Sequence, residues 1–321
     1  MGTTHDILAE TYFRTFSHTN SVLATIAPGD TVRTKMVDAG GQDLDDVRRS
    51  EPGNPLTGPF FIEGAEPGDA ILVRLDQVRC NRNWGWSSYR LGLAALLPDT
   101  IETLYSSNYK QDLIRPGRNN IVPWDIDLAA GRTSLREPIT KTAKLDFPVS
   151  PMVGCIGVAA LGDFAPTSGP SGAYGGNIDY NRIGEGATVM LPVYHPGALL
   201  YVGDGHALQA DGEPLGTAVE TSMDVVFTVE LRKGAAPISP RVESAEALMT
   251  VGSQPEFVSS MNRGLQMATS DMVTWLGTDF GLQPWEAHLL IGMTGQYDVV
   301  TVAGSMALRV PKSVLPARIA G

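Results

Sequence analysis

One short stretch of this sequence gathers residue types that could do chemistry. The segment YVGDGHALQADGEPLGTAVE contains Asp204, His206, Asp211, Glu213 and Glu220. Asp204 and His206 are two positions apart, so on an extended strand both side chains would point to the same side. A turn after the histidine would bring Asp211 and Glu213 back toward them, and Glu220 would join from the next strand. The spacing therefore predicts a set of converging ligands.

The chemistry of such a set depends on its donor atoms. Imidazole together with carboxylates suits Zn, Mn or Fe, whereas oxygen ligands alone suit Ca or Mg. Because His206 is present, we expect a divalent transition metal, with zinc first and calcium as the alternative. A solvated acidic hairpin whose Asp and Gly residues make turns would contain the same residues, so the spacing leaves both interpretations open.

A glycine-rich segment lies upstream of this stretch. In GAYGGNIDYNRIGEG, Asp179 follows the pair Gly175 and Gly176. Glycines let the backbone approach a substrate or direct amide donors at an oxyanion, so Asp179 is a candidate ligand or base. A turn followed by an ordinary strand edge is the other interpretation. His195, which precedes a proline in PVYHPGA, is either a second imidazole at the site or a packing residue.

Side-chain nucleophiles are the competing chemistry. Cys155 lies in the apolar run MVGCIGVAA, where burial would raise the pKa of the thiol and make it inert. Ser168 and Ser171 lie in a glycine-rich loop without a Gly-x-Ser-x-Gly elbow. No glycine pattern of the dinucleotide or P-loop kind opens a helix, which argues against nucleotide cofactors. Serine or cysteine catalysis stays open as the alternative to a metal.

Short strands broken by turns must position these residues. SVLATIAPGDTVRTKMV and LTGPFFIEGAEPGDAILVRLDQVRC each predict two strands joined as a hairpin, which is typical of a sandwich or barrel. Three further strand regions follow Pro148. Apolar residues at three- and four-residue steps predict a helix over 261–281, a second helix begins near Pro284, and strands return in YDVVTVAGSMALRVPKSVL.

Composition gives the same fold class. The chain has 321 residues, of which 43% are hydrophobic and 18% charged, with 35 glycines and 22 prolines. This mixture predicts an α+β protein that is predominantly β. We divide it into a β-rich region at 1–145, a glycine-rich β core carrying the proposed site at 146–235, and an α+β region at 236–321, all within one compact unit.

Charge and sequence signals exclude several function classes. The net charge of −11 argues against nucleic acid and anionic membranes as partners. The two cysteines give neither a disulfide framework nor a thiolate zinc site. The first twenty residues lack an export signal and the apolar runs are shorter than the roughly twenty residues of a membrane helix, so we expect a cytoplasmic protein.

Several segments, taken in order, resemble the acetamidase/formamidase family of amide hydrolases. The matching segments are NPLTGPFFIEGAEPGDAILV, PMVGCIGVA, SGAYGGNIDYNRIGEGATVMLPVYHPGALLYVGDGHALQADGEPLGTAVE and TWLGTDFGLQPWEAHLLI. The resemblance implies a β-rich sandwich or barrel core with a C-terminal α+β segment, a homo-oligomer, and hydrolysis of a short carboxamide to an acid and ammonia. A divalent metal is associated with some members. Ala210 stands where the family usually has glycine.

The resemblance extends the list of candidate site residues. Its GGNID and GDGHALQADGE motifs match the candidate ligands and carboxylates described above. We expect Asp179, Asp204 and His206 to hold the metal, which would polarise the amide and lower the pKa of water from 15.7 to about 7. The expected catalytic carboxylates are Glu213, Glu220 and Asp211, and the expected substrate-binding residues are Gly175, Gly176, Asn177 and His195. A non-catalytic β-protein with a structural calcium site is a further alternative.

Overall fold

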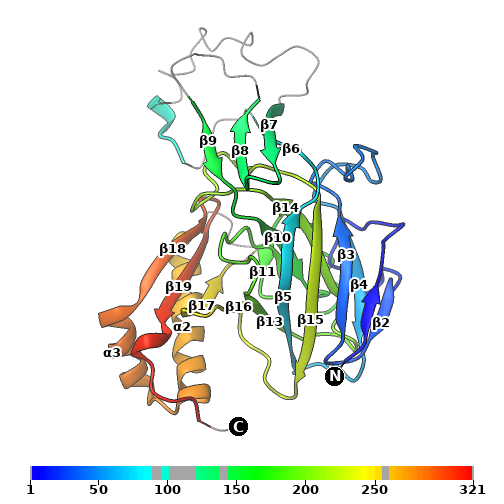
Figure 1. Ribbon diagram of the computed structural model, residues 1–321. Helices are drawn as coiled ribbons and strands as arrows, with labels where there is room; N and C mark the ends of the chain where they lie inside the picture. The colour runs from blue at the N-terminus through cyan, green and yellow to red at the C-terminus, as the bar shows by residue number, and fades with distance from the viewer. Residues whose placement is uncertain (1, 89–94, 101–120, 137–143, 255–259, 320–321) are drawn as a thin grey trace.

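The structure, a computed structural model, describes residues 2–88, 95–100, 121–136, 144–254 and 260–319. Within them, two sheets pack face to face around the main core, and a smaller sheet and a helical layer flank them (Figure 1). The predominantly β, α+β fold class is therefore confirmed.

The larger of the two sheets has nine strands, antiparallel except for β1 beside β3. Its strands, in spatial order, are β1 (Thr4–Asp6), β3 (Thr31–Met36), β15 (Met223–Arg232), β5 (Ala70–Cys80), β13 (Thr188–Pro192), β16 (Arg241–Glu243), β17 (Ala247–Gly252), β19 (Ser305–Pro311) and β18 (Gln296–Thr301). All three of the predicted regions contribute strands to this sheet. The division into three regions within one compact unit stays a prediction.

The second sheet has six strands and carries most of the site. Its strands, in spatial order, are β11 (Ser171–Gly172), β12 (Gly175–Asn177), β10 (Met152–Gly157), β14 (Leu200–His206), β4 (Leu56–Ile62) and β2 (Ala24–Ile26). Fully buried side chains such as Phe60 and Val202 from this sheet share one core with Val73 and Phe227 of the other. The two sheets therefore form the predicted sandwich.

The two predicted hairpins are wrong in their pairing, although all four strands form. β2 and β4 lie in the six-stranded sheet, whereas β3 and β5, which follow them across the turns, lie in the nine-stranded sheet. Each turn therefore carries the chain from one sheet to the other. Turn residues specify a reversal of direction, but the partner of each strand depends on where its apolar face finds a core.

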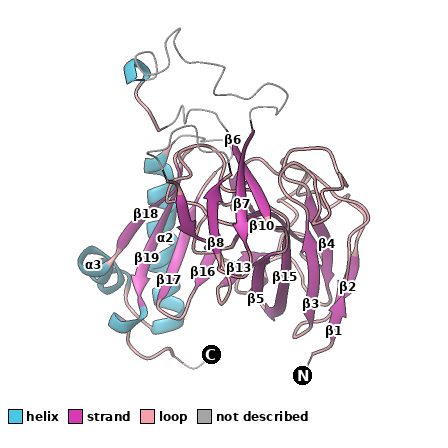
Figure 2. Ribbon diagram, turned by 45° about the horizontal axis from the view of Figure 1, so that its top comes forward, coloured by secondary structure: helices cyan, strands magenta, loops and turns pink. Residues whose placement is uncertain are grey.

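A four-stranded sheet covers one end of the sandwich (Figures 1 and 2). It contains β6 (Trp84–Ser88), β7 (Ile121–Asp127), β8 (Arg132–Leu135) and β9 (Asp146–Pro148). Trp124 and Ile126 of this sheet pack on Ala207 and Val219, which belong to the loop after β14. The small sheet therefore covers the loop between β14 and β15, which contains the candidate residues Asp211, Glu213 and Glu220.

The C-terminal part confirms both predicted helices. The helical elements are α2 (Met261–Phe280), α3 (Pro284–Thr294) and a short 3-10 helix, η2 (Lys312–Val314). Gly281 ends α2 in a left-handed conformation, and Trp275 and Leu276 pack on Leu248 and Leu308 of the sheet. Among the described residues, no helix is both long enough and apolar enough to cross a bilayer.

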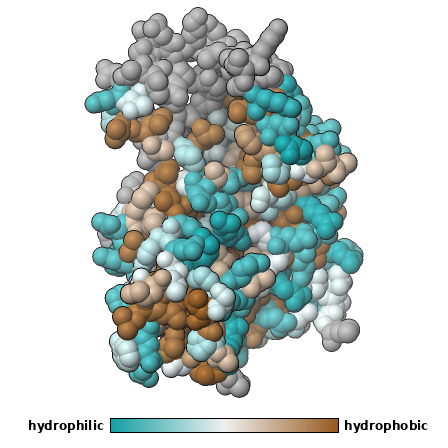
Figure 3. All heavy atoms as spheres, turned by 60° about the vertical axis from the view of Figure 1, so that its left-hand side comes forward, coloured by the Kyte–Doolittle hydropathy of each residue, from teal (hydrophilic) through white to brown (hydrophobic). Residues whose placement is uncertain are grey.

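One apolar face of α3 is exposed to solvent. Trp285, Leu289 and Met293 recur every four residues and are 64%, 55% and 80% exposed. Figure 3, which turns this side of the molecule forward, shows apolar side chains gathered on it. Such a stripe is wider than the isolated apolar residues of an ordinary surface.

Candidate active site

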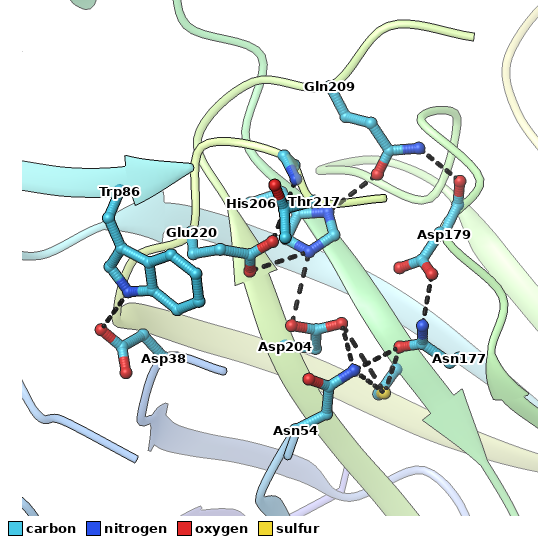
Figure 4. A network of polar contacts seen from close by, with 12 residues as sticks. Asp38, Asn54, Trp86, Asn177, Asp179, Asp204, His206, Gln209, Thr217 and Glu220 are labelled. Carbon is cyan, nitrogen blue, oxygen red and sulfur yellow. Dashed lines mark hydrogen bonds and ion pairs between the residues drawn. The ribbon is translucent and has the colours of Figure 1, made fainter. Parts of the chain in front are cut away.

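The predicted acidic and imidazole side chains meet at the end of β14 (Figure 4). Asp204 and His206 belong to this strand. Glu220 forms a backbone bridge to His206 and another to Trp86 of β6, whose N–H donates to the Glu220 carbonyl at 3.0 Å. Glu220 therefore joins from the end of the returning loop, just before β15, and not from within the next strand.

Asp204, His206 and Glu220 form the tightest part of this cluster. The Nε2 atom of His206 lies 3.1 Å from Glu220 Oε2 and 3.4 Å from Asp204 Oδ1, and all three side chains are buried. Within the described residues, none of these three atoms has a hydrogen-bond partner. Buried polar atoms are almost always hydrogen-bonded, so three that face one another unpaired indicate a position for a cation.

Asp179 and Glu213 approach the same imidazole from another side. One ligand atom from each of Asp179, His206 and Glu213 lies within 4.8 Å of the others, and the same holds for Asp204, His206 and Glu220. Asp179 Oδ1 is also buried and unpartnered among the described residues. Five of the predicted residues therefore form two groups of three that share His206.

Amide side chains hold these ligands in place. Asn177 donates a hydrogen bond to Asp179, and Asn54 donates to Asp204 Oδ2 at 3.1 Å and to Asn177 Oδ1 at 3.0 Å. Gln209 Oε1 lies 2.8 Å from His206 Nδ1. Asp179, Asp204 and His206 are thus each oriented by a neutral amide side chain, as is common around metal sites.

The backbone is strained where it presents these residues. Asn54, Asp179, Asp204 and Glu213 have φ values of 51°, 50°, 59° and 44°, in the left-handed region. For Asp204 this corrects the expectation of a regular extended strand, although its side chain still meets His206. Such strain costs of order 1–3 kcal/mol per residue and gathers at functional sites.

Gly154 in β10 provides the floor beneath the carboxylates. A Cβ atom at this position would lie 2.6 Å from Asp179 Oδ1 and 2.8 Å from Asp204 Oδ2. The carboxylates can lie this close to the strand only because position 154 has no side chain.

Burial of so many acids shifts their titration. Burial raises the pKa of Glu213 to about 8 and that of Glu220 to about 7. Burial, reinforced by Glu213 and Asp204, also raises the pKa of Asp179 well above its usual value. Burial by itself lowers the pKa of His206, but the Glu220 and Asp204 carboxylates outweigh it and hold that pKa well above its usual value. The centre therefore favours added positive charge.

A cavity of about 350 Å³ opens onto this centre. Asn177, Asp179 and Glu213 line one side, and the turn between β18 and β19, from Thr301 to Ser305, lines the other. This space is an access route from solvent to the Asp179 side of the cluster, and the C-terminal hairpin forms part of its wall.

Four other candidate residues lie outside the converging group. Asp211 is exposed and accepts a hydrogen bond from Asn181 at 2.7 Å. His195 lies before the start of β14, where its Nε2 atom is 2.8 Å from the Ala160 carbonyl oxygen. Gly175 and Gly176, with φ values of 92° and 99°, form β12 and do not line the cavity. The roles predicted for these four residues stay predictions.

The candidate nucleophiles are occupied by other contacts. The Cys155 thiol is buried and donates to Asn177 Oδ1 at 2.8 Å, and burial, reinforced by Asp204, raises its pKa well above the usual value. Ser168 donates to the Gly53 carbonyl at 2.7 Å, and Ser171 pairs with Ser253 at 2.5 Å. These contacts favour neither a thiolate nor an activated hydroxyl.

Comparison with known proteins gives the family. The sequence profile of the Acetamidase/Formamidase family matches residues 12–114 and 127–294. The chain belongs to this family. A crystal structure of a recombinant predicted acetamidase/formamidase from Thermoanaerobacter tengcongensis has a TM-score of 0.77 at 27% identity, with 97% of each chain covered. The fold expected from the resemblance is thereby confirmed.

Two curated relatives of this acetamidase/formamidase-family chain match over shorter spans. A putative formamidase of Schizosaccharomyces pombe is 29% identical in an alignment of 230 residues that covers 59% of this chain. An acetamidase of Mycolicibacterium smegmatis is 27% identical in an alignment of 258 residues that covers 66% of this chain. The matches span 56% and 63% of the lengths of those two proteins.

Sequence reasoning missed three residues of this family member's site. Gln209 was visible as a polar residue three positions after His206, the spacing at which a tight turn can return to the imidazole. Gly154 interrupts the apolar run of β10, and a glycine within a strand often marks a close approach. Asn54 follows Gly53 and precedes a proline, where Asn tolerates a left-handed backbone. Each of these sequence features was visible, but none of them indicated that the residue contacts a candidate ligand.

Proposed function

We propose that this chain hydrolyses a short linear carboxamide, of the size of formamide or acetamide, to the carboxylic acid and ammonia. The single observation that carries the proposal is the set of buried, mutually facing and unpartnered atoms Asp204 Oδ1, His206 Nε2 and Glu220 Oε2. The family membership and the names of the two relatives supply the substrate class.

The donor set fits a divalent metal, and zinc first. An imidazole nitrogen and carboxylate oxygens are all donor types that zinc accepts, whereas calcium prefers oxygen alone. Asp204, His206 and Glu220 would hold the ion, with Asp179 beside them. A bound divalent ion supplies Lewis-acid polarisation of the amide carbonyl and lowers the pKa of water.

The residues of the chain divide the remaining work. Glu213 is only partly buried and lines the cavity, so its carboxylate would take the proton of the attacking water and deliver it to the departing ammonia. Asn177, at the cavity wall, would orient the amide. Compared with the expectation from sequence, Glu220 becomes a ligand and Glu213 alone is the base, because Glu220 contacts His206 and lies deeper.

Metal analysis combined with an ammonia assay tests this function. Purified protein should contain about one zinc or similar ion per chain and release ammonia from formamide or acetamide, and a chelator should abolish the release. The change His206→Ala should lower activity by more than about 100-fold. His288→Ala, at an exposed position on α3, is the matched control and should retain activity.

The same measurements separate the alternatives. Full activity in metal-depleted protein, together with an acyl adduct on Cys155, Ser168 or Ser171 in mass spectra, would replace the metal route with a nucleophile. Bound calcium without ammonia release from any amide would indicate a structural site.

A further inference from the structure

We infer that Gln209 is a positioning residue that fixes the hydrogen of the His206 ring on Nδ1, and so leaves the lone pair of Nε2 facing Asp204 and Glu220. The inference rests on the proposed function, because it assigns the group that prepares the imidazole of that site to bind a cation. It depends on a chain of three groups: the Asp179 carbonyl, the Gln209 amide and the His206 ring (Figure 4). The carbonyl determines which group donates each hydrogen bond along this chain.

The fixed end is a backbone carbonyl. Gln209 Nε2 lies 2.6 Å from the carbonyl oxygen of Asp179, and the side chain of Gln209 is buried. A carbonyl oxygen can only accept, so the amide group that faces it must be the NH₂. The other amide atom, Oε1, is thereby directed at His206.

The ring must then carry a hydrogen on Nδ1, whether it is neutral or protonated. Gln209 Oε1 lies 2.8 Å from His206 Nδ1, and an amide oxygen can only accept. Nδ1 must therefore carry a hydrogen. A neutral imidazole has a single N–H, so its other nitrogen, Nε2, has a lone pair that points at carboxylate oxygens 3.1 Å and 3.4 Å away.

In the neutral ring that arrangement is unfavourable unless positive charge, either a proton on Nε2 or a bound cation, lies between the atoms. A lone pair facing two carboxylates is electrostatically repelled, whereas a divalent cation there would accept all three donors. The tautomer with its hydrogen on Nε2 would instead satisfy the carboxylates without any metal. Gln209 opposes that tautomer, because a ring without a hydrogen on Nδ1 would face the oxygen of Gln209.

The loop around Gln209 keeps it from turning away. Backbone hydrogen bonds from Ala207 N to Val219 O at 2.8 Å and from Val219 N to Leu208 O at 3.0 Å fix the residues just before it. Trp124 and Ile126 pack on Ala207 and Val219 from outside. The position of Gln209 is therefore built into the fold.

The test compares two substitutions at the same position. Gln209→Leu keeps similar volume but removes both hydrogen bonds, whereas Gln209→Glu keeps an oxygen acceptor for Nδ1. The probe is Zn²⁺ alone, with affinity measured by competition with a chromophoric chelator. Long-range ¹H–¹⁵N correlation spectra of ¹⁵N-histidine-labelled protein report the Nδ1–H of His206 and its exchange with solvent.

We expect Gln209→Leu to weaken zinc binding by about 10- to 100-fold and to lose the solvent-protected Nδ1–H signal. Gln209→Glu should keep that signal and most of the affinity. Thr250→Val is the control for lost buried hydrogen bonds, because the Thr250 hydroxyl donates to the Ala268 carbonyl at 2.7 Å, remote from the site. It should leave zinc affinity and the signal unchanged.

Two outcomes would overturn the inference. One is zinc affinity within about twofold of the wild type together with a retained Nδ1–H signal in Gln209→Leu. The other is a loss in Gln209→Glu as large as that in Gln209→Leu, which would show that only the contact with Asp179 matters. If Gln209→Leu fails to fold, Gln209→Met provides the same comparison. A wild type that binds no zinc but shows a protected Nδ1–H would contradict the proposed function and leave the tautomer assignment standing.

Discussion

At the scale of single residues, the energetic problem of this molecule is the burial of like charges around His206. Asp179, Asp204 and Glu220 are nearly inaccessible to water, and Glu213 is partly so. Carboxylates in such surroundings either take up protons or bind a cation. The raised pKa of Glu220 indicates that protons compete with a metal for its carboxylate, and the raised pKa of Glu213 indicates that protons also bind beside it.

This competition predicts how stability depends on pH without metal. Folded-state pKa values of about 8 for Glu213 and about 7 for Glu220, above their usual value of 4.5, give stability that is complete below about pH 4.5 and is lost as pH rises through 7 to 8. His206, whose folded pKa is also raised, acts in the same direction. The melting temperature of metal-free protein should therefore fall between pH 6 and pH 8.5, and the increase caused by added zinc should grow over that range.

Thermal scans with and without zinc across that range measure this dependence. The double change Glu213→Gln and Glu220→Gln removes two of the titrating groups and should flatten the metal-free profile. A metal-free melting temperature that climbs with pH would contradict the assignment of these buried acids.

Gly154 gives a second prediction at this scale. Gly154→Ala would place a methyl group within 2.9 Å of the Asp179 and Asp204 carboxylates, so it should weaken zinc binding and lower stability by about 1–3 kcal/mol. Gly292→Ala in α3 is the matched control, since a Cβ there meets open space and should stabilise the helix by about 0.5–1 kcal/mol. Denaturant unfolding and chelator competition measure both quantities, and an unaffected zinc affinity in Gly154→Ala would count against this packing argument.

At the scale of elements, the site is assembled from one strand and two loops, and a C-terminal hairpin closes its cavity. β14 supplies Asp204 and His206, the segment after β12 supplies Asp179, and the loop before β15 supplies Glu220. The C-terminal hairpin β18–β19 forms the opposite wall of the cavity. Its attachment to the Asp179 segment runs through Tyr180, whose hydroxyl donates to Asp298 Oδ2 at 2.6 Å.

Removing the Tyr180 hydroxyl tests this attachment. Tyr180→Phe should destabilise the protein by about 1.5–3 kcal/mol, because a buried hydrogen bond to a charged group is lost while Asp298 keeps Arg309 as its partner. Tyr297→Phe is the matched control, since its hydroxyl pairs with Thr269 at an exposed position and should matter little. Equal stability of the two variants in denaturant titrations would show that the contact does not fasten the hairpin.

At the scale of the whole molecule, the exposed apolar stripe of α3 is the surface through which we expect copies of this chain to associate. Trp285, Leu289 and Met293 lie on one helical face, and Glu286, the helix's acidic residue, is used in the cap. An apolar stripe of this kind on both copies would be self-complementary.

A cytoplasmic location stays a prediction.

Light scattering after size-exclusion chromatography tests this expectation. The wild type should have a mass that is a multiple of the 34.3 kDa chain. The double change Leu289→Glu and Met293→Glu should reduce it, while Val314→Glu, at another exposed apolar position, should not. A monomeric wild type would refute the oligomer, and an unchanged mass in the α3 variant would move the contact to another surface.

The sequence by itself identified the candidate site residues and the local elements. The residue types and spacing of Asp204, His206, Glu213 and Glu220 predicted a cluster, and periodicity with a terminal glycine predicted α2 to within a residue. These features are local, because they depend on side-chain periodicity and turn residues within a short segment.

Only the tertiary structure decided which candidates meet. It brought Asp179 and Glu220 to His206, left Asp211 and His195 outside, converted two expected hairpins into crossings between sheets, and introduced Gln209 and Gly154 as supports. Such contacts depend on how two sheets share one core, which is set by the burial of apolar faces from the whole chain and not by the spacing of residues within any one segment.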